Sequence, residues 1–230
     1  MKIITTILLS ILSIKSFTQK DIKIKLTESY ELGNIILALT KYGKDDPWDV
    51  QKINPYYGEV INYFEPVKNH PLLDSVNYSR KDWEKFLGFR TDMYAFSFNK
   101  NNELVRDFPF NWFGPEEVDK NIDSINDFVK KSNYRNFYSK HNNFYNQLII
   151  HYKNYYFLEN SFSFLDRVLP NQTNKNKKNY VIAISTLVGG QNSHRDIDSI
   201  TTVDFPNIGK DLISGNFSKN ITQRVIDNHS

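Results

Sequence analysis

The sequence predicts an α+β fold with a mostly helical body and a small antiparallel sheet near the C-terminus. Through most of residues 28–168, apolar residues recur at three- and four-residue intervals, which is the period of amphipathic helices. After residue 179 the pattern changes to two short runs rich in β-branched residues, which are typical of strands. The length of 230 residues and the hydrophobic share of 40% favour one domain, which we expect to span residues 19–230.

The first eighteen residues are typical of a signal peptide. Lys2 supplies a basic start, and residues 3–14 form an apolar run that is too short to cross a bilayer comfortably. Small residues at Ser16 and Thr18 predict cleavage after Thr18, so that the mature chain begins at Gln19. We expect a secreted or periplasmic protein with no stable membrane span after cleavage. A buried N-terminal helix or an uncleaved anchor is the alternative interpretation.

Charge and cysteine content exclude several classes of function. The whole chain has a formal net charge of +3, and loss of Lys2 and Lys15 with the signal peptide leaves +1. A nearly neutral protein has no electrostatic attraction to nucleic acid, and we interpret the basic cluster at 174–180 as a solvated loop. The chain contains no Cys, so disulfides, thiolate metal ligands and a Cys nucleophile are excluded. A metal site would have to use His, Asp or Glu.

The first elements after the signal peptide are a strand and a helix. In residues 21–29 apolar and polar side chains alternate, which predicts a short strand. In residues 30–43 apolar side chains fall at helical spacing, and we expect Gly43 to cap the C-terminal end of this helix. Residues 45–49 predict a turn.

Two helical regions follow, and prolines separate their parts. Residues 57–74 predict a helix that stops near Pro66 and a second short helix that begins around Pro71, because proline is tolerated in a first turn. Residues 79–98 predict a longer helix with Ser79 as its N-cap.

The middle of the chain is rich in aromatic residues. Residues 106–118 are interpreted as an aromatic loop in which Pro115, Glu116 and Glu117 begin a helix, because acids suit the positive N-terminal end of a helix. A paired acid site formed by these two glutamates is the alternative. The longest helical pattern runs through residues 133–158, and residues 169–179 predict a linker rich in Asn and Lys.

The remaining part of the chain predicts a strand, a second strand and a helix. Residues 180–190 form a β-branched run that ends in a glycine pair. Residues 199–206 form the second strand, which we expect to pair with the first as a hairpin. Residues 220–230 then begin a helix with Asn220 as its cap.

The five histidines lack the spacing of a zinc-binding helix, which needs two His four residues apart. His141 and His151 lie on the longest predicted helix, but ten residues of helix place them about 15 Å apart. We therefore interpret both as packing or surface residues. The chain also has no G-x-S-x-G motif and no glycine-rich phosphate loop.

The stretch "LVGGQNSHRD", residues 187–196, is the candidate binding loop. Two glycines after a strand permit a tight turn or the close approach of another group, and several polar side chains follow them. The functional interpretation is a loop that lines a substrate cleft. The alternative is a strand-ending turn with solvated polar residues. The candidate substrate-binding residues are Leu187, Gly189, Gly190, Gln191 and Asn192.

The order of several stretches resembles a known family. These stretches are "YELGNIILALT", "YYGEVINYFEPVKNHPLL", an aromatic helical middle and "IAISTLVGGQN". Their order is similar to that in the secreted bacterial proteins of domain of unknown function 4932, which resemble zinc metallopeptidases of the zincin type. The resemblance covers most of residues 28–230 as a pattern, and its strongest pieces are "FEPVKNHP" and "STLVGGQN".

The resemblance implies a zincin-like fold in which a helix with an H-E-x-x-H motif follows the strands. The two His of that motif hold zinc, and its Glu polarises the attacking water. It also implies that residues 181–187 lie at the edge of the cleft and hold a peptide by main-chain pairing, with the turn 189–192 beside them. The metal-binding helix is then expected near residues 224–229.

The sequence departs from this pattern at its end. His229 is followed by Ser230, and this single candidate ligand is not enough for a catalytic zinc, which needs about three protein ligands. The resemblance thus implies a secreted metallopeptidase-like protein, truncated and inactive as a peptidase, without the zinc of the complete family. The alternatives are a non-catalytic extracytoplasmic module that binds a peptide or another ligand, and a purely structural domain.

Overall fold

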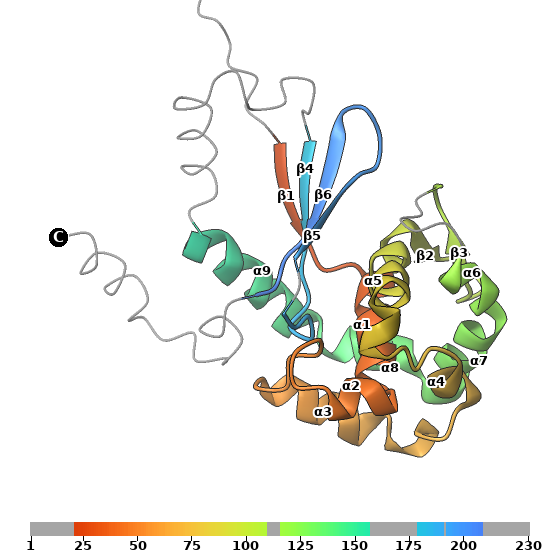
Figure 1. The fold of residues 1–230 in the computed structure, drawn as a ribbon. Coiled ribbons are helices and arrows are strands. Elements are labelled where there is room, and N and C mark those ends of the chain that lie inside the picture. Colours follow the sequence, from red (N-terminus) through yellow and green to blue (C-terminus); the bar gives the residue numbers. More distant parts are fainter. Residues whose placement is uncertain (1–20, 110–115, 157–178, 191, 209–230) are drawn as a thin grey trace, which may run out of the picture.

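A helical body and a four-stranded sheet form the described part of the computed structural model (Figure 1). The structure describes residues 21–109, 116–156, 179–190 and 192–208. The strands are β1 (Asp21–Lys25), β2 (Phe96–Phe98), β3 (Leu104–Arg106), β4 (Asn179–Ala183), β5 (Ser193–Asp196) and β6 (Thr201–Phe205). The α-helices are α1 (Glu28–Leu39), α2 (Lys41–Asp45), α3 (Pro55–Tyr63), α4 (Pro71–Ser75), α5 (Trp83–Asp92), α6 (Glu117–Lys120), α7 (Ile122–Ser132), α8 (Tyr134–Lys140) and α9 (Asn142–Tyr156). The α+β class predicted from the sequence is confirmed.

The larger sheet is mixed, with the strand order β1-β4-β6-β5. β1, β4 and β6 run parallel, and β5 pairs antiparallel with β6. The predicted antiparallel sheet is therefore wrong, because β4 and β6 are parallel neighbours, with Val181 opposite Val203, and are not the two arms of a hairpin. The prediction that the sheet lies near the C-terminus is also incomplete. One of its strands is β1, at the start of the described chain. The hairpin partner of β6 is β5, which lies inside the predicted loop 187–196.

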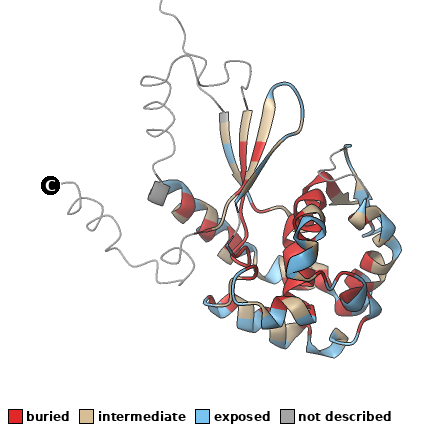
Figure 2. Ribbon diagram, in the orientation of Figure 1, coloured by how far each residue is buried: buried red, intermediate tan, exposed pale blue. Residues whose placement is uncertain are grey.

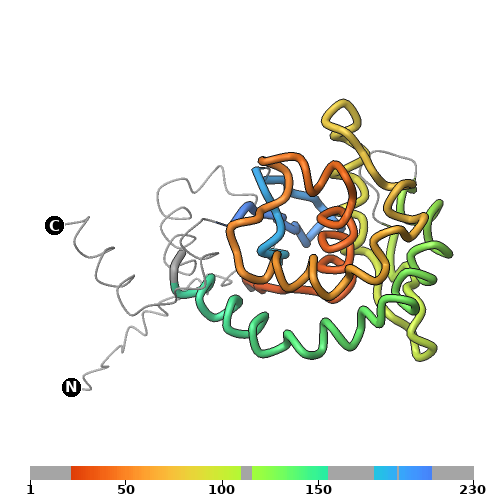
Figure 3. Tube along the Cα trace, turned by 90° about the horizontal axis from the view of Figure 1, so that it is seen from below, coloured from red at the N-terminus to blue at the C-terminus, as the bar shows by residue number. Residues whose placement is uncertain are grey.

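Helix α1 lies at the centre of the core. Every residue from Ser29 to Leu39 is buried, and Thr27 caps the helix by accepting a hydrogen bond from the Tyr30 N–H. A helix that is buried on all sides must be enclosed by other elements. Figure 2 shows this burial along α1 and on the elements around it, and Figure 3 shows α7, α8 and α9 following one another along one side of the molecule.

The predicted helix 30–43 is divided into α1 and α2 at Thr40. The Thr40 hydroxyl donates to the Leu37 carbonyl oxygen at 2.7 Å and accepts from the Gly43 N–H at 2.9 Å. The prediction that Gly43 caps the helix is wrong, because Gly43 lies within α2. A Cβ at this position would lie 2.0 Å from the Leu37 carbonyl oxygen. Glycine is therefore needed there for the tight turn between the two helices.

Proline and capping signals were reliable guides to where helices begin. α3 ends at Tyr63, before Pro66, and α4 begins at Pro71, as predicted. Ser79 caps a short 3₁₀ turn, η2 (Arg80–Asp82), and Asp82 completes a capping box with it. Helix α6 begins at Glu117, within the predicted start at 115–117.

The predicted helix 79–98 is too long. It ends at Asp92, and η3 (Met93–Ala95) leads into β2, which pairs antiparallel with β3. Another 3₁₀ turn, η1 (Glu65–Val67), follows α3. The aromatic and β-branched residues of β2 and β3 are compatible with a strand and with one face of a helix. Pairing between β2 and β3 favours the strand.

The predicted helix 133–158 is also divided, because α8 and α9 meet at His141. Several other predictions lie outside the described residues: the signal peptide 1–18, most of the linker 169–179, the helix 220–230 and the metal-binding helix 224–229. In the ranges that the structure describes, no helix is both long and apolar enough to cross a bilayer.

Candidate functional site

The chain leaves the sheet after β4 and enters the helical body. The Ile184 N–H donates to the Lys25 carbonyl oxygen at 2.9 Å, next to the end of β1. Residues 184–189 are all buried, including the polar Ser185 and Thr186. The predicted binding loop 187–196 therefore begins inside the protein and reaches the surface only at Gly190.

Two segments, residues 48–51 and 187–190, are joined by their main chains. The three hydrogen bonds run from the Gln51 N–H to the Leu187 oxygen at 3.0 Å, from the Gly189 N–H to the Asp49 oxygen at 3.2 Å, and from the Gly190 N–H to the Trp48 oxygen at 2.6 Å. Val50 and Val188 also form an antiparallel bridge. The main chain of residues 187–190 is thus occupied by the protein itself.

Gly189 is required for this contact. A Cβ at Gly189 would lie 1.9 Å from the Trp48 carbonyl oxygen, far inside van der Waals contact. A close approach at the glycine pair is one of the two interpretations that the sequence permits. The approaching group is the chain's own segment 48–51.

Arg90 holds the same segment from the core side. Its side chain is 2% exposed, and one guanidinium nitrogen donates to the Asp49 carbonyl oxygen at 2.6 Å. Burial lowers the pKa of Arg90, and the guanidinium also lies 4.6 Å from the centre of the Phe86 ring. The Asp49 carboxylate accepts from the Tyr42 hydroxyl at 2.5 Å. The main-chain carbonyl and the side-chain carboxylate of Asp49 are therefore both fixed. The neighbouring residue Trp48 is 63% exposed.

β5 is an outer strand of the sheet, since its one partner among the described strands is β6. The Ile197 N–H donates to the Thr201 oxygen at 3.0 Å, so Ile197 and Thr201 form a hydrogen-bonded pair. Hydrogen-bonded and non-bonded pairs alternate along an antiparallel ladder, which makes Arg195 and Ser193 the next bonded positions of β5. The main-chain groups of His194 and Asp196 therefore point away from β6. The Arg195 side chain donates to the His194 oxygen at 2.7 Å.

The structure places the predicted site residues in different environments. Leu187 and Gly189 are buried, whereas Gly190 and Asn192 are exposed, and Gln191 and His229 lie outside the described residues. The strand assigned to the edge, residues 181–187, is not at an edge, because β4 lies between β1 and β6. The outer strand on this side of the sheet is β5. A substrate-binding role for the five loop residues stays a prediction.

A buried acid site was missed in the sequence. Glu31 on α1 is 0% exposed, and its Oε1 accepts from the Tyr56 hydroxyl at 2.8 Å. The Tyr56 and Tyr145 hydroxyl oxygens are 2.7 Å apart. Burial raises the pKa of Glu31 to about 7, against the opposing effects of Ser185, Tyr56 and His141. The signal was a carboxylate one helical turn before Ile35, in a helix rich in apolar residues.

His141 is a packing residue, as expected from its sequence context. One ring nitrogen lies 2.8 Å from the Phe137 oxygen and the other 2.8 Å from Glu59 Oε2. Its ring also packs edge-on against Tyr56, with centroids 5.3 Å apart. These contacts place His141 next to the buried acid site.

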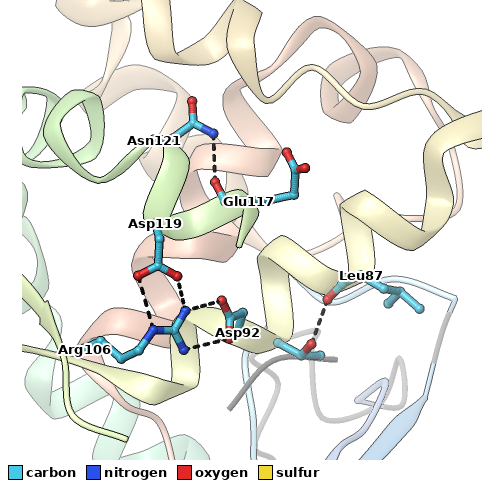
Figure 4. A network of polar contacts seen from close by, with 7 residues as sticks. Leu87, Asp92, Arg106, Glu117, Asp119 and Asn121 are labelled. Carbon is cyan, nitrogen blue, oxygen red and sulfur yellow. Dashed lines mark hydrogen bonds and ion pairs between the residues drawn. The ribbon is translucent and has the colours of Figure 1, made fainter. Parts of the chain in front are cut away.

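A second polar network, centred on Arg106, joins β3 to α5 and α6 (Figure 4). The Arg106 guanidinium donates to both Asp92 oxygens at 3.1 and 2.7 Å, and it also donates to Asp119. Burial raises the pKa of Asp92, and Arg106 opposes that rise. Glu117, a member of the predicted glutamate pair, accepts from Tyr78 at 2.7 Å. Both aspartates of the network are therefore paired with one cation, which is an arrangement that fixes helices.

In the part of the chain that the structure describes, no group of three or more His, Cys, Asp or Glu is arranged to hold a metal ion. The described residues therefore offer no set of zinc ligands from which a reaction step can be derived. Comparisons with family models, with curated protein sequences and with solved structures give no match for this chain.

Proposed function

We propose that this protein binds an extended peptide along the outer edge of β5. The observation that carries the proposal is the outward direction of the main-chain groups of His194, on a strand whose one partner among the described strands is β6. An added strand forms its hydrogen bonds with such outward groups. An extended polypeptide is the ligand whose donors and acceptors match such an edge.

Trp48 supplies the apolar part of the proposed surface. Its carbonyl oxygen binds the Gly190 N–H, and Gly190 is joined to Ser193 at the start of β5 by a stretch of at most about 10 Å. Large aromatic side chains are frequent anchors in peptide and protein recognition. Because its segment is fixed by Arg90, Trp48 needs little ordering when a peptide binds.

The resemblance to secreted zincin-like peptidases supports a peptide as the ligand. We accordingly propose a secreted or periplasmic metallopeptidase-like protein in which β5, and not β4, is the strand that pairs with the peptide. A non-catalytic extracytoplasmic peptide-binding module is the second candidate. Both candidates use the same edge, and in both we expect the chain to be inactive as a peptidase.

The edge is tested by removing one outward N–H without disturbing the β5–β6 ladder. His194→Pro does this, because proline is tolerated in an outer strand where its nitrogen faces away from the partner strand. His194→Ala is the matched control, since it removes the imidazole and keeps the N–H. Dodecapeptides selected from a random display library on the full chain provide the probes, and fluorescence anisotropy measures their binding. We expect His194→Ala to bind and His194→Pro to lose at least tenfold in affinity. Equal affinity of both variants would refute pairing of the peptide with the outer edge of β5.

A cleavage assay tests the expectation that the chain is inactive as a peptidase. The full chain is incubated with the selected peptides and with casein, with added zinc and separately with a chelator. Zinc-dependent, chelator-sensitive cleavage would contradict that expectation. Peptide binding that survives both chelation and the loss of residues 220–230 supports the non-catalytic module.

A further inference from the structure

Glu31 joins parts of the chain that are far apart in the sequence. It lies on α1, its hydrogen-bond donor Tyr56 lies on α3, and Tyr145 on α9 continues the same chain of hydroxyl groups. Ser185, directly beyond β4 and Ile184, acts on the same carboxyl group. One buried carboxyl therefore connects three helices with the segment that leads to the binding loop.

The carboxyl group is only partly satisfied by its partners. Oε1 accepts from Tyr56, whereas Oε2 forms no hydrogen bond of ordinary geometry with the described residues, although the Ser185 hydroxyl is close enough to favour the ionised form. A negative charge with one bare oxygen in the interior is costly, and a neutral carboxylic acid in the same place is much less so.

The other groups around Glu31 do not supply a strong counter-charge. The facing side chains are Tyr30 on α1, Tyr56 on α3, Tyr134 and Tyr138 on α8, Tyr145 on α9, and His141 between α8 and α9. Burial raises the pKa of each of these tyrosines, so they stay neutral at physiological pH. His141 is held by Phe137 and Glu59, and it lowers the pKa of Glu31 less than Ser185 and Tyr56 do.

We propose that Glu31 is a proton-dependent link between the helical body and the segment 185–190. In its protonated form the neutral carboxyl fits its buried place between α1, α3, α9 and Ser185. Loss of the proton places a poorly satisfied charge between them and loosens the attachment of residues 185–190. This inference does not rest on the proposed peptide binding, because it concerns the attachment of the segment and not its ligand.

The pH range follows from the raised pKa of about 7 against an ordinary value of 4.5. The folded state holds this proton more tightly than the unfolded state does. The stabilising effect of the protonated link is therefore complete at pH values below the ordinary pKa, and it is lost as the pH rises through the folded-state value. Residues 185–190 should loosen on the alkaline side of neutrality.

Carbon-13 NMR of the full chain, labelled at the Glu carboxyl carbons, tests the link directly. We expect one Glu carboxyl to titrate near pH 7, and the amide signals of residues 185–190 to shift with the same midpoint. Both changes should vanish in Glu31→Gln and persist in Glu59→Gln, which removes an exposed carboxylate next to His141. The carbon-13 signal comes from the Glu carboxyl itself, so it distinguishes titration of Glu31 from titration of the His141 imidazole.

Tyr56→Phe keeps the inference testable if Glu31→Gln fails to fold. It removes the hydrogen bond that favours the ionised form, so the midpoint should move upward by about half a pH unit or more. The inference is overturned if every Glu carboxyl titrates below about pH 5.5, or if residues 185–190 do not follow the carboxyl.

Discussion

The buried guanidinium of Arg90 donates to the carbonyl oxygen of Asp49 at 2.6 Å, and the same oxygen accepts from the Gly189 N–H at 3.2 Å. Two parts of the chain distant in sequence thus share one acceptor. The contact fixes the loop that carries Trp48, and it fixes the end of the predicted binding strand against that loop.

Replacement of Arg90 tests how strongly the loop depends on this contact. Arg90→Met keeps most of the side-chain volume but removes the donor, so we expect a loss of about 2–4 kcal/mol in the free energy of unfolding. Urea unfolding measures the loss, and quenching of Trp48 fluorescence should report a looser loop. Lys81→Met, on the exposed turn η2, is the control and should change stability by less than about 0.5 kcal/mol.

A pair of glycine substitutions tests the close approach at residue 189. Gly189→Ala places a Cβ 1.9 Å from the Trp48 oxygen, and we expect a destabilisation of more than about 2 kcal/mol. Gly58→Ala in α3 meets no atom within 4 Å and should stabilise the protein by about 0.5–1 kcal/mol. Thermal unfolding of both variants provides the measurement. Similar melting temperatures for the two variants would contradict the described contact.

Glu31 predicts an unusual dependence of stability on pH. Because its pKa is raised to about 7, the free energy of unfolding should fall as the pH increases from about 4.5 to 7, by up to about 3 kcal/mol from this group. Glu31→Gln should remove that dependence, so that the variant is the more stable protein at pH 8.5. Urea unfolding at several pH values gives both curves. Parallel curves would show that Glu31 does not bind its proton more tightly in the folded state.

The Arg106 network predicts unequal effects for its members. Arg106→Met leaves the nearly buried Asp92 without its cation, so we expect a loss of about 3 kcal/mol at pH 7. Asp119→Asn should cost less, about 1 kcal/mol, because the Asp119 side chain is more than a third exposed and Asp92 still pairs with Arg106. Urea unfolding distinguishes the two, and equal losses would mean that the network does not depend on burial.

Replacement of Arg195 should strengthen peptide binding, whereas His194→Pro should weaken it. Its side chain donates to the His194 oxygen, one of the outward acceptors of β5. Arg195→Ala should free this oxygen and raise the affinity for selected peptides several-fold, provided that the peptide pairs with β5 as proposed. Anisotropy titrations with the same peptides measure the change, and Lys68→Ala serves as a distant control. A lower affinity would assign Arg195 a direct contact with the peptide.

Local chemistry made parts of the fold predictable from the sequence. The start of α4 at Pro71 and the N-cap at Ser79 depend on a few neighbouring residues, and both were predicted. The break at His141 and the end of α5 at Asp92 depend on packing against other elements. A continuous helical period gives no sign of such breaks.

The sheet and the candidate site were less accessible, because they join distant residues. The unbroken apolar run of β4 is typical of a parallel strand covered on both sides, yet its neighbours β1 and β6 cannot be named from the run itself. The glycine pair permitted either a close approach or a tight turn, and nothing local identifies Trp48 as the partner of Gly189. Glu31 was visible as a carboxylate in a helix rich in apolar residues. Its partners Tyr56 and Tyr145 become evident only in three dimensions.

The pairing of β1 with β4 has a consequence for how the chain folds. Asp21 lies opposite Asn179, so the first described strand finds its partner only after almost all of the intervening helices have been made. Contacts over such a long loop form slowly, whereas helical contacts between neighbours form early. We therefore expect the helical body to assemble first, with β1 as an unpaired edge until the last strands arrive. A nascent or partly folded chain would be most prone to aggregate through that edge.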